Sequence, residues 1–246
     1  MNGNVITNGR ITTGPNVVTK DTIIYVDAGN VESYPGSGTI WSDISGNGFN
    51  GTLTNGPTFN PSNYGNIVFD GSDDYVSFGD NNSYTNPNGF SINIWFKPAS
   101  YGGANPLLEK YQPGGYEFVF GTLFDNLYGW VYDNDTNGYT GRYLTNLSNF
   151  IPLDTWGNFA YTYDGGGIPS SSKIYINGIQ RDTTDFDNSS FITIRNTNTD
   201  LTIGRYNTGI GGPMNGSVGL MNFYSRTLTE DEIIQNYNEM KFRYEN

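Results

Sequence analysis

The stretch "FSINIWFKP", residues 90–98, sets the pattern that decides the fold of this chain. Apolar residues at alternate positions share one side of an extended segment, and these are Phe90, Ile92, Ile94 and Phe96. The other side carries Ser91, Asn93 and Trp95. This alternation is typical of a β-strand that turns one face toward a core. It predicts a strand over residues 90–98.

Other stretches repeat this alternation between clusters of turn residues. They cover residues 22–30, 66–80, 116–123, 127–135, 158–166, 173–180, 191–195, 200–206 and 216–226. Residues 116–123 and 127–135 predict a hairpin, and the Asn-Gly pair within residues 173–180 suits a tight hairpin turn. Ten or more strands with regular turns predict an all-β fold in which two antiparallel sheets pack as a jelly-roll sandwich.

Composition narrows the chemistry that the chain can perform. Its 246 residues carry a net charge of −12, and aromatic residues make up 15%, which is enough to build a folded core. The chain has no cysteine and no histidine, which excludes disulfides, zinc sites of the usual kind and Cys–His or Ser–His catalytic pairs. The acidic balance without a Lys/Arg cluster argues against nucleic acid, and no apolar run is long enough for membrane insertion.

The two ends of the chain differ from the strand-rich middle. Near the C-terminus, Thr229 followed by Glu232 forms a capping box, which predicts one short α-helix over residues 230–239. Its expected apolar stripe consists of Ile233, Ile234, Tyr237 and Met240. Residues 1–20 lack aromatic side chains and predict an extended N-terminal arm, which leaves residues 21–246 as one domain.

Seven stretches in order resemble laminin-G-like domains of the concanavalin A-like lectin/glucanase fold. They are "DISGNGFNGTL", "FDGSDDYVSFGD", "FSINIWFKP", "WGNFAYTYDGG", "KIYINGIQRD", "LTIGRY" and "GLMNFYSRTLTEDEIIQNYN", and they span roughly residues 22–240. The resemblance implies a two-sheet jelly roll in which Trp41, Trp95 and Trp156 are structural aromatics. The stretch "GPNVVTKDTIIYVDAGNVESYPGSGTIWSDISGNG" is also similar to laminin-G-like proteins that tailed bacteriophages encode as virion structural proteins.

The virion resemblance implies a location and partners. We expect a capsid decoration or a head or tail appendage, assembled in the host cytoplasm and extracellular after lysis. Its partners would be major capsid or tail subunits and further copies of the same chain. The N-terminal arm, residues 1–20, or a face of the sandwich would make the docking contact.

The loop "DISGNGFNG", residues 43–51, has two interpretations. Asp43, Ser45 and Asn47 suit Asx- and ST-turn hydrogen bonds. Oxygen ligands at alternate positions beside glycine also suit Ca²⁺, although the loop lacks the terminal acidic residue of an EF-hand. Calcium is common in the fold that the chain resembles. The residues that could form a structural calcium site are Asp27, Asp43, Asp70, Asp73 and Asp74.

Catalysis is not expected from this sequence. Glucanases of the resembled fold place acidic residues, glutamates prominently, at alternate positions along one strand. None of the seven glutamates here repeats in that way along a predicted strand, and Glu109 and Glu117 stand alone. A carboxylate pair assembled from different strands stays open at this point.

Aromatic residues supply the candidate binding site. Tyr128, Trp130 and Tyr132 alternate and therefore share one face of a strand. Tyr116 and Tyr139 lie beside glycine or asparagine near by in the sequence. Such rings can stack on sugars, and neighbouring Asp and Asn side chains can bind hydroxyls, but the row can equally be core or a subunit interface.

Two functions remain open on the sequence alone. The first is a non-enzymatic virion structural protein with a lectin-like domain that binds host-surface carbohydrate. The second is a stand-alone carbohydrate-binding lectin or adhesin that is not tied to a capsid. Residues 1–18 lack the basic and apolar pattern of an export signal, which a secreted lectin is expected to carry.

Overall fold

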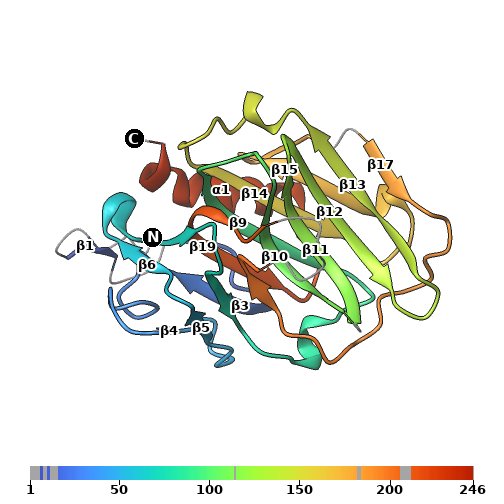
Figure 1. Cartoon of the computed structure of the whole chain (residues 1–246), viewed down its shortest axis with the longest axis horizontal. Helices are drawn as coiled ribbons and strands as arrows, with labels where there is room; N and C mark the ends of the chain where they lie inside the picture. The colour runs from blue at the N-terminus through green and yellow to red at the C-terminus, as the bar shows by residue number, and fades with distance from the viewer. Residues whose placement is uncertain are drawn as a thin grey trace.

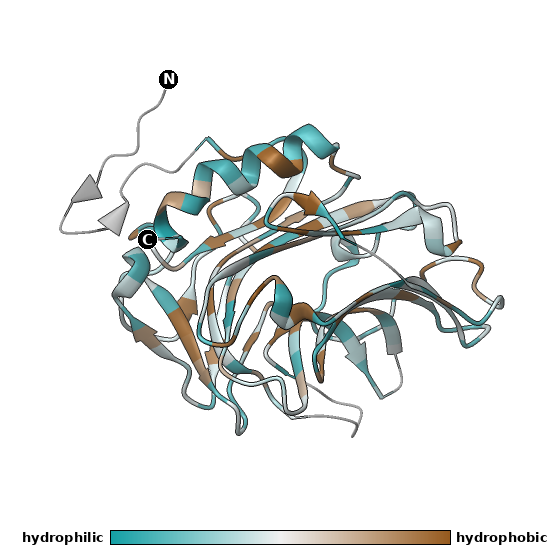
Figure 2. Ribbon diagram, turned by 90° about the horizontal axis from the view of Figure 1, so that it is seen from above, coloured by the Kyte–Doolittle hydropathy of each residue, from teal (hydrophilic) through white to brown (hydrophobic). Residues whose placement is uncertain are grey.

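The computed structural model describes residues 6–7, 10–11, 16–113, 115–181, 184–205 and 212–245. Two antiparallel β-sheets stack face to face and one α-helix lies at the C-terminus, as predicted (Figure 1). No helix in these described ranges is both long and apolar enough to cross a membrane. Figure 2 shows the helix on the outer side of one sheet, with the second sheet beyond it.

The first sheet has nine strands, and aromatic side chains cover part of its outer face. In spatial order its strands are β17 (Thr184–Asp187), β13 (Gly138–Thr145), β12 (Asn126–Asp133), β11 (Gly115–Leu123), β10 (Ala104–Gln112), β18 (Thr202–Ile203), β8 (Tyr75–Ser77), β5 (Gly51–Thr54) and β4 (Ile40–Trp41). The predicted hairpin is confirmed, because β11 and β12 pair antiparallel.

The second sheet carries the helix. In spatial order its strands are β16 (Ile179–Gln180), β15 (Ser172–Ile176), β14 (Gly157–Tyr163), β9 (Phe90–Pro98), β19 (Asn215–Tyr224), β7 (Asn66–Asp70) and β6 (Thr58–Asn60), and β3 (Thr22–Asp27) also pairs with β19. The remaining elements are the hairpin strands β1 (Ile6–Thr7) and β2 (Arg10–Ile11), the 3-10 turns η1 (Ser62–Tyr64), η2 (Asn82–Tyr84), η3 (Leu147–Asn149) and η4 (Pro169–Ser171), and α1 (Glu230–Tyr244).

Strand β9 shows how the sequence pattern builds the two sides of its sheet. Its alternate apolar side chains face the other sheet and are at most 1% exposed: Phe90, Ile92, Ile94 and Phe96. Trp95 points to the opposite side, where its ring stacks on Tyr244 of α1 at a centroid distance of 4.4 Å. The predicted alternation of residues 90–98 is therefore confirmed, and α1 gives the outer face of this sheet a second apolar layer.

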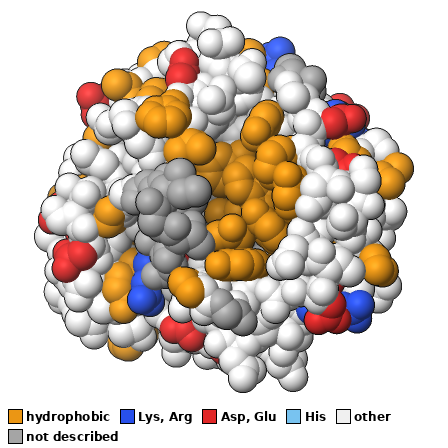
Figure 3. Space-filling view, turned by 45° about the vertical axis from the view of Figure 1, so that its right-hand side comes forward, with side chains coloured by type: hydrophobic (Ala, Val, Ile, Leu, Met, Phe, Trp, Pro, Cys, Tyr) orange, Lys and Arg blue, Asp and Glu red, His pale blue; other side chains and the backbone are white. Residues whose placement is uncertain are grey.

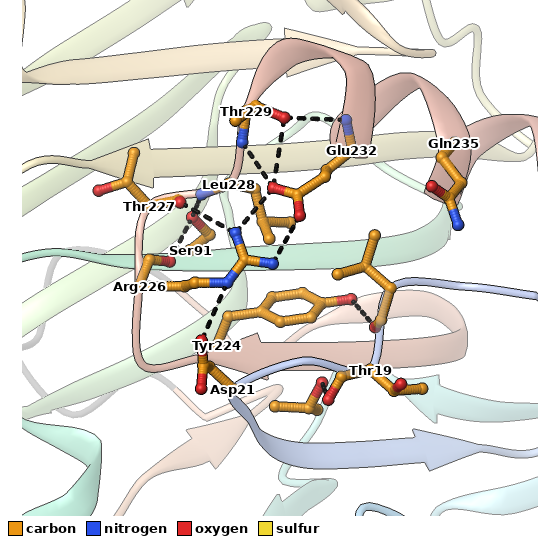
Figure 4. Close-up of polar contacts among 12 residues, drawn as sticks. Thr19, Asp21, Ser91, Tyr224, Arg226, Thr227, Leu228, Thr229, Glu232 and Gln235 are labelled. Atoms are coloured by element: carbon orange, nitrogen blue, oxygen red, sulfur yellow. Dashed lines mark hydrogen bonds and ion pairs between the residues drawn. The ribbon is translucent and has the colours of Figure 1, made fainter.

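Helix α1 starts where the capping box predicts. The Thr229 side chain accepts from Glu232 N, and Glu232 Oε2 accepts from Thr229 N at 2.9 Å. Arg226 donates two hydrogen bonds of 2.7 Å to the Glu232 carboxylate (Figure 4). The helix continues to Tyr244 rather than to residue 239, because Tyr244 is buried against the sheet.

The C-terminal extension of α1 also carries a buried ion pair. Arg243 Nη1 donates to both oxygens of Asp27 at 2.9 Å, and both side chains are 0% exposed.

The predicted apolar stripe of α1 is wrong in part. Ile234 is 37% exposed, whereas the polar residue Asn236 is buried.

Two further sequence expectations need correction. Residues 191–195 form no strand; the Asp133 carboxylate accepts from Ile192 N and Thr193 N and so satisfies backbone donors that a strand partner would otherwise take. Residues 16–20 of the predicted arm pack on the domain, with Val17 4% exposed and Val18 N donating to Asn236 Oδ1 at 2.8 Å. The rest of the predicted arm, apart from β1 and β2, and residue 206 of the predicted strand 200–206 lie outside the described residues.

Candidate functional site

A continuous layer of aromatic rings covers the outer face of the nine-stranded sheet from β10 to β17. The register places Tyr132 opposite Tyr139, Tyr128 opposite Tyr143, and Phe186 opposite Gly141. Because paired residues share a face, rings from five neighbouring strands meet on one surface. This aromatic array consists of Tyr111, Tyr116, Tyr128, Trp130, Tyr132, Tyr139, Tyr143 and Phe186.

Close ring contacts hold the array together. Tyr128 and Trp130 stack at a centroid distance of 4.4 Å, and Trp130 lies 4.8 Å from Phe186. Phe186 in turn stacks on Tyr139 at 4.5 Å, and Tyr111 stacks on Tyr116 at 4.3 Å. These distances suit offset and edge contacts between rings, so the array is a preformed surface rather than a set of independent side chains.

Glycine on the same face brings Trp130 close to the sheet. Trp130 pairs with Gly141 of β13, and a Cβ at Gly141 would lie 2.2 Å from Gly129 O and 2.6 Å from Trp130 Cβ. A side chain at this position would therefore collide with the neighbouring strand and lift the indole. Gly141 therefore allows the close approach of β13 to Trp130.

The array is distinct from the core between the sheets. Leu127 and Val131, which point to the opposite side of β12 from Trp130, are 0% exposed and belong to that core. Trp130 and Tyr132 are half-buried, and Tyr128 is 3% exposed because its neighbours cover it. Figure 3 shows hydrophobic side chains filling a hollow in the middle of this face, over the part of the sheet that holds β11 to β13.

Burial affects the tyrosine hydroxyls within the array. Tyr111 Oη donates to Tyr132 Oη at 3.2 Å. Burial, followed by this hydrogen bond, raises the pKa of Tyr132 far above its ordinary value. The hydroxyl therefore stays protonated at physiological pH and can donate or accept a hydrogen bond.

Polar residues adjoin the array along its β10 edge, on the same face of the sheet. Pairing puts Glu109 of β10 in one row with Val119 and Trp130, and continues it through Thr202 of β18 to Ser77 of β8. Ser77 Oγ donates to the Asp200 carboxylate at 3.0 Å. Hydroxyls and carboxylates therefore lie beside the rings on the same face.

The five predicted aromatic residues, Tyr116, Tyr128, Trp130, Tyr132 and Tyr139, all belong to this array. Sequence reasoning missed Tyr111, Tyr143 and Phe186. The spacing of Tyr139, Gly141 and Tyr143 repeats that of residues 128–132 and was a usable signal. Phe186 joins the array only because β17 pairs with β13, and no local sequence pattern predicts that pairing.

The two glutamates that stood alone in the sequence lie on opposite faces of the sheet. Glu109 pairs with Val119 on the outer side, whereas Lys110 pairs with the core residue Phe118 and contacts the carboxylate of Glu117. Glu117 is 0% exposed and accepts from Thr197 N at 2.7 Å. The fold does not bring these two carboxylates together as an acid–base pair.

The predicted metal ligands separate into three places. Carboxylate oxygens of Asp70, Asp73 and Asp74 lie within 4.8 Å of one another, a spacing that one Ca²⁺ could bridge. Asp27 is instead engaged by Arg243. Asp43 accepts from Tyr25 N and Ser45 N, both at 2.9 Å, so the turn interpretation of its loop is confirmed. A calcium site at the Asp70–Asp73–Asp74 cluster stays a prediction.

Comparisons with known proteins agree with this architecture. A family model described as the Concanavalin A-like lectin/glucanases superfamily matches residues 70–234. No curated protein matches the chain in sequence.

Solved structures resemble the chain in fold. The botulinum neurotoxin serotype D ligand binding domain, in complex with N-acetylneuraminic acid, superposes with a TM-score of 0.66 at 14% identity over 90% of this chain and 51% of that one. The receptor binding domain of a botulinum neurotoxin C/D mosaic gives a TM-score of 0.67 at 14% identity, over 90% of this chain and 52% of that one. The chain thus spans about half the length of these toxin domains.

Domain 4 of AbnA, an extracellular arabinanase from Geobacillus stearothermophilus, is similar over nearly its whole length. In its complex with arabinotriose it superposes with a TM-score of 0.62 at 17% identity, over 88% of this chain and 98% of that one. At these identities the likeness concerns the fold.

Proposed function

The chain belongs to the Concanavalin A-like lectin/glucanases superfamily, and from this premise we propose that it is a non-enzymatic, lectin-like protein that binds carbohydrate on its aromatic array. The observation that carries the proposal is the layer of contacting rings on the outer face of the nine-stranded sheet. A contiguous layer of rings outside the core between the sheets is typical of a binding face.

The chemistry of the array suits a sugar. The apolar faces of sugar rings pack on aromatic rings, and Trp130 lies at the centre of a preformed group of them. Tyrosine hydroxyls and the half-buried Ser77 hydroxyl at the end of the adjoining polar row supply partners for sugar hydroxyls. A half-buried array loses little side-chain freedom on binding, which lowers the cost of association.

The likeness to sugar-bound domains supports the same proposal. One solved relative in fold carries N-acetylneuraminic acid and another carries arabinotriose. The separation of Glu109 and Glu117 on opposite faces of the sheet supports a binding role without hydrolysis.

A virion setting is the second part of the proposal. Residues 16–20 pack beside α1, where Asn16 accepts from the Gln235 side chain at 2.8 Å. Helix α1 covers the outer face of the eight-stranded sheet, so Asn16, to which residues 1–15 are attached, lies on the side away from the array. This arrangement suits a protein that docks on a particle, alone or with further copies of itself, and turns its sugar-binding face outward.

Binding to an oligosaccharide panel tests the main proposal. We expect the wild-type chain to bind at least one panel member, and Trp130→Ala to weaken that binding by about ten-fold or more. Phe124→Ala is the control, because Phe124 is 60% exposed and lies outside the array. Wild-type affinity in the Trp130→Ala variant would contradict the proposal.

Two further measurements separate the related proposals. If the array were a subunit interface, Trp130→Ala would reduce the oligomer mass in sedimentation, whereas a glycan site predicts no change.

A truncation tests the virion role. A chain that lacks residues 2–15 keeps the packed segment 16–20 and should fold, yet fail to incorporate into particles. Normal incorporation would reject the role of residues 1–15 as the anchor.

A further inference from the structure

A cavity of about 530 Å³ lies beside α1, and none of the described residues that line it belongs to the aromatic array. Three segments that are far apart in the sequence form this cavity: residues 149–150 at the end of η3, the turn between β15 and β16, and one face of α1. Its volume is in the range of small-ligand sites. The cavity is therefore a candidate binding site separate from the array.

The turn that forms one wall of the cavity is fixed by its sequence. Asn177 and Gly178 have φ values of 52° and 77°, the left-handed values that an Asn-Gly hairpin turn requires. Gly178 packs closely on α1, because a Cβ there would lie 3.1 Å from the ring of Tyr237. The Tyr237 ring in turn stacks on Trp95 of β9 at a centroid distance of 5.7 Å. The turn and the helix therefore hold a preformed cavity between them.

Two amide side chains in the lining offer hydrogen-bond donors. Asn177 Oδ1 accepts from Asn158 N at 2.9 Å, and Asn238 Oδ1 accepts from Lys241 Nζ at 2.8 Å. Because each of these oxygens already accepts a hydrogen bond, the NH₂ hydrogens are left for a ligand. The lining thus suits a ligand that is rich in acceptor oxygens.

Arg181 adds a positive charge to these donors. Its guanidinium lies 5.0 Å from the centre of the Phe150 ring, a distance at which the ring attracts a cation and helps to hold it in place. Arg181 Nε is buried and has no hydrogen-bond partner among the described residues. A buried donor without an acceptor costs free energy, which an acceptor oxygen of a ligand would recover.

The acids near the cavity do not form part of its lining. Arg181 is the charged residue among the described residues that line it. Glu245 contacts the hydroxyl of Tyr237, and Asp231 is exposed one helical turn before Ile234, where salt screens its charge. An anionic group that enters the cavity would therefore meet a guanidinium and amide donors at contact distance.

From this arrangement we propose that the cavity beside α1 is a second sugar site, which binds sugars that carry a carboxylate, such as a uronic acid or a sialic acid. The planar guanidinium of Arg181 pairs with the carboxylate. The NH₂ groups of Asn177 and Asn238 donate to oxygens of the sugar. The 37% exposed side chain of Ile234 supplies an apolar contact for the sugar ring. This site goes beyond the proposed function and does not depend on the array.

Matched acidic and neutral sugars test the proposal. The acidic probes are 3′-sialyllactose and cellobiouronic acid, and lactose and cellobiose are their neutral counterparts. In calorimetric titrations we expect the wild-type chain to bind at least one acidic probe, about ten-fold more tightly than its neutral counterpart or better. Comparison of the two acidic probes distinguishes a sialic acid from a uronic acid.

Three variants that each lower the net charge by one unit assign the binding to the cavity. Arg181→Gln should weaken binding of the acidic probe by about ten-fold or more, and Asn238→Asp should weaken it by several-fold. Lys173→Gln is the control, because Lys173 is exposed on β15 and lies outside the cavity lining. Melting curves establish that the variants fold. Because Asn238 is exposed on α1, its variant decides the test if Arg181→Gln does not fold.

The outcomes are distinguishable from those of the proposed function. The second site is overturned if no acidic probe binds better than its neutral counterpart, or if folded Arg181→Gln and Asn238→Asp keep the wild-type affinity. An equal loss in Lys173→Gln also overturns it, since the effect would then be one of net charge. Acidic-probe binding that Trp130→Ala weakens and Arg181→Gln does not belongs to the array, which overturns this proposal and supports the proposed function.

Discussion

At the scale of single residues, the array depends on where side chains are missing as much as on where rings are present. Trp130 can lie close to the sheet because Gly141 stands opposite it. Alternation along β12 was sufficient to predict that Tyr128, Trp130 and Tyr132 share a face. The partners of these rings on β13 and β17 could not be predicted, because strand pairing is a long-range property of the chain.

Gly141→Ala tests this local account. The added Cβ would meet backbone atoms rather than a flexible side-chain end, so we expect a loss of about 1–3 kcal/mol in the free energy of unfolding. Urea unfolding measures the change. Gly103→Ala is the control, because a Cβ at Gly103 meets nothing within 4 Å. Equal stability of the two variants would contradict the close packing at Gly141.

At the scale of elements, the sequence predicted strands well where apolar residues alternate without interruption. Strand β10 was missed because Pro106 lies within it and two register shifts break its alternation. Residues 191–195 alternate but are not a strand, since a carboxylate binds their backbone. The start of helix α1 was predicted correctly, because its capping box is local in sequence. The end was predicted too early, at residue 239, because burial of Arg243 and Tyr244 extends the helix to Tyr244.

The cap of α1 makes a pH-dependent contribution to stability. The Arg226 guanidinium, by hydrogen bonds to Glu232, lowers the pKa of that carboxyl to about 2 from an ordinary 4.5. Because this pKa is lowered in the folded state, the stabilisation is complete above about pH 4.5 and disappears as the pH falls toward 2.

We therefore expect Glu232→Gln to be less stable than wild type at pH 7, and the difference to shrink between pH 4.5 and pH 2. Unfolding by urea across this range measures it. Glu230→Gln removes the same charge from the same helical turn and leaves Arg226 and its ion pair in place. A difference that is constant with pH, or one that Glu230→Gln reproduces, would reject the ion pair as its source.

The loop between β7 and β8 is the element that could hold calcium. Burial raises the pKa of Asp74, and the charges of Asp70 and Asp73 raise it further, so the three carboxylates repel one another. A bound Ca²⁺ would relieve this repulsion and stabilise the native state by mass action. We expect a higher melting temperature in calcium than in chelator, and a smaller difference in Asp73→Asn than in the exposed control Asp154→Asn. An unchanged midpoint would reject the site.

At the scale of the whole molecule, the two sheets have different outer faces. Helix α1 and residues 16–20 cover the eight-stranded sheet, whereas the nine-stranded sheet presents its aromatic array. The sandwich itself followed from the strand pattern, because the central strands β9, β11, β12, β14 and β19 lie in predicted segments, although β10, β13 and several short strands were missed. Which face α1 covers did not follow, since it depends on the packing of the helix rather than on any strand pattern.

The most direct test of carbohydrate binding on the array uses its central tryptophan as a reporter. The chain has four tryptophans, so a ¹⁵N-labelled sample gives four indole N–H resonances, from Trp41, Trp95, Trp130 and Trp156. Trp41 and Trp95 are 0% exposed, and Trp156 packs against Tyr244 of α1 at 4.7 Å, so these three serve as internal controls. On titration with a neutral oligosaccharide that binds, we predict a saturable shift of the Trp130 resonance while the other three stay in place. Saturable binding that leaves Trp130 unmoved, or that moves Trp156 instead, would contradict a binding site on the aromatic array.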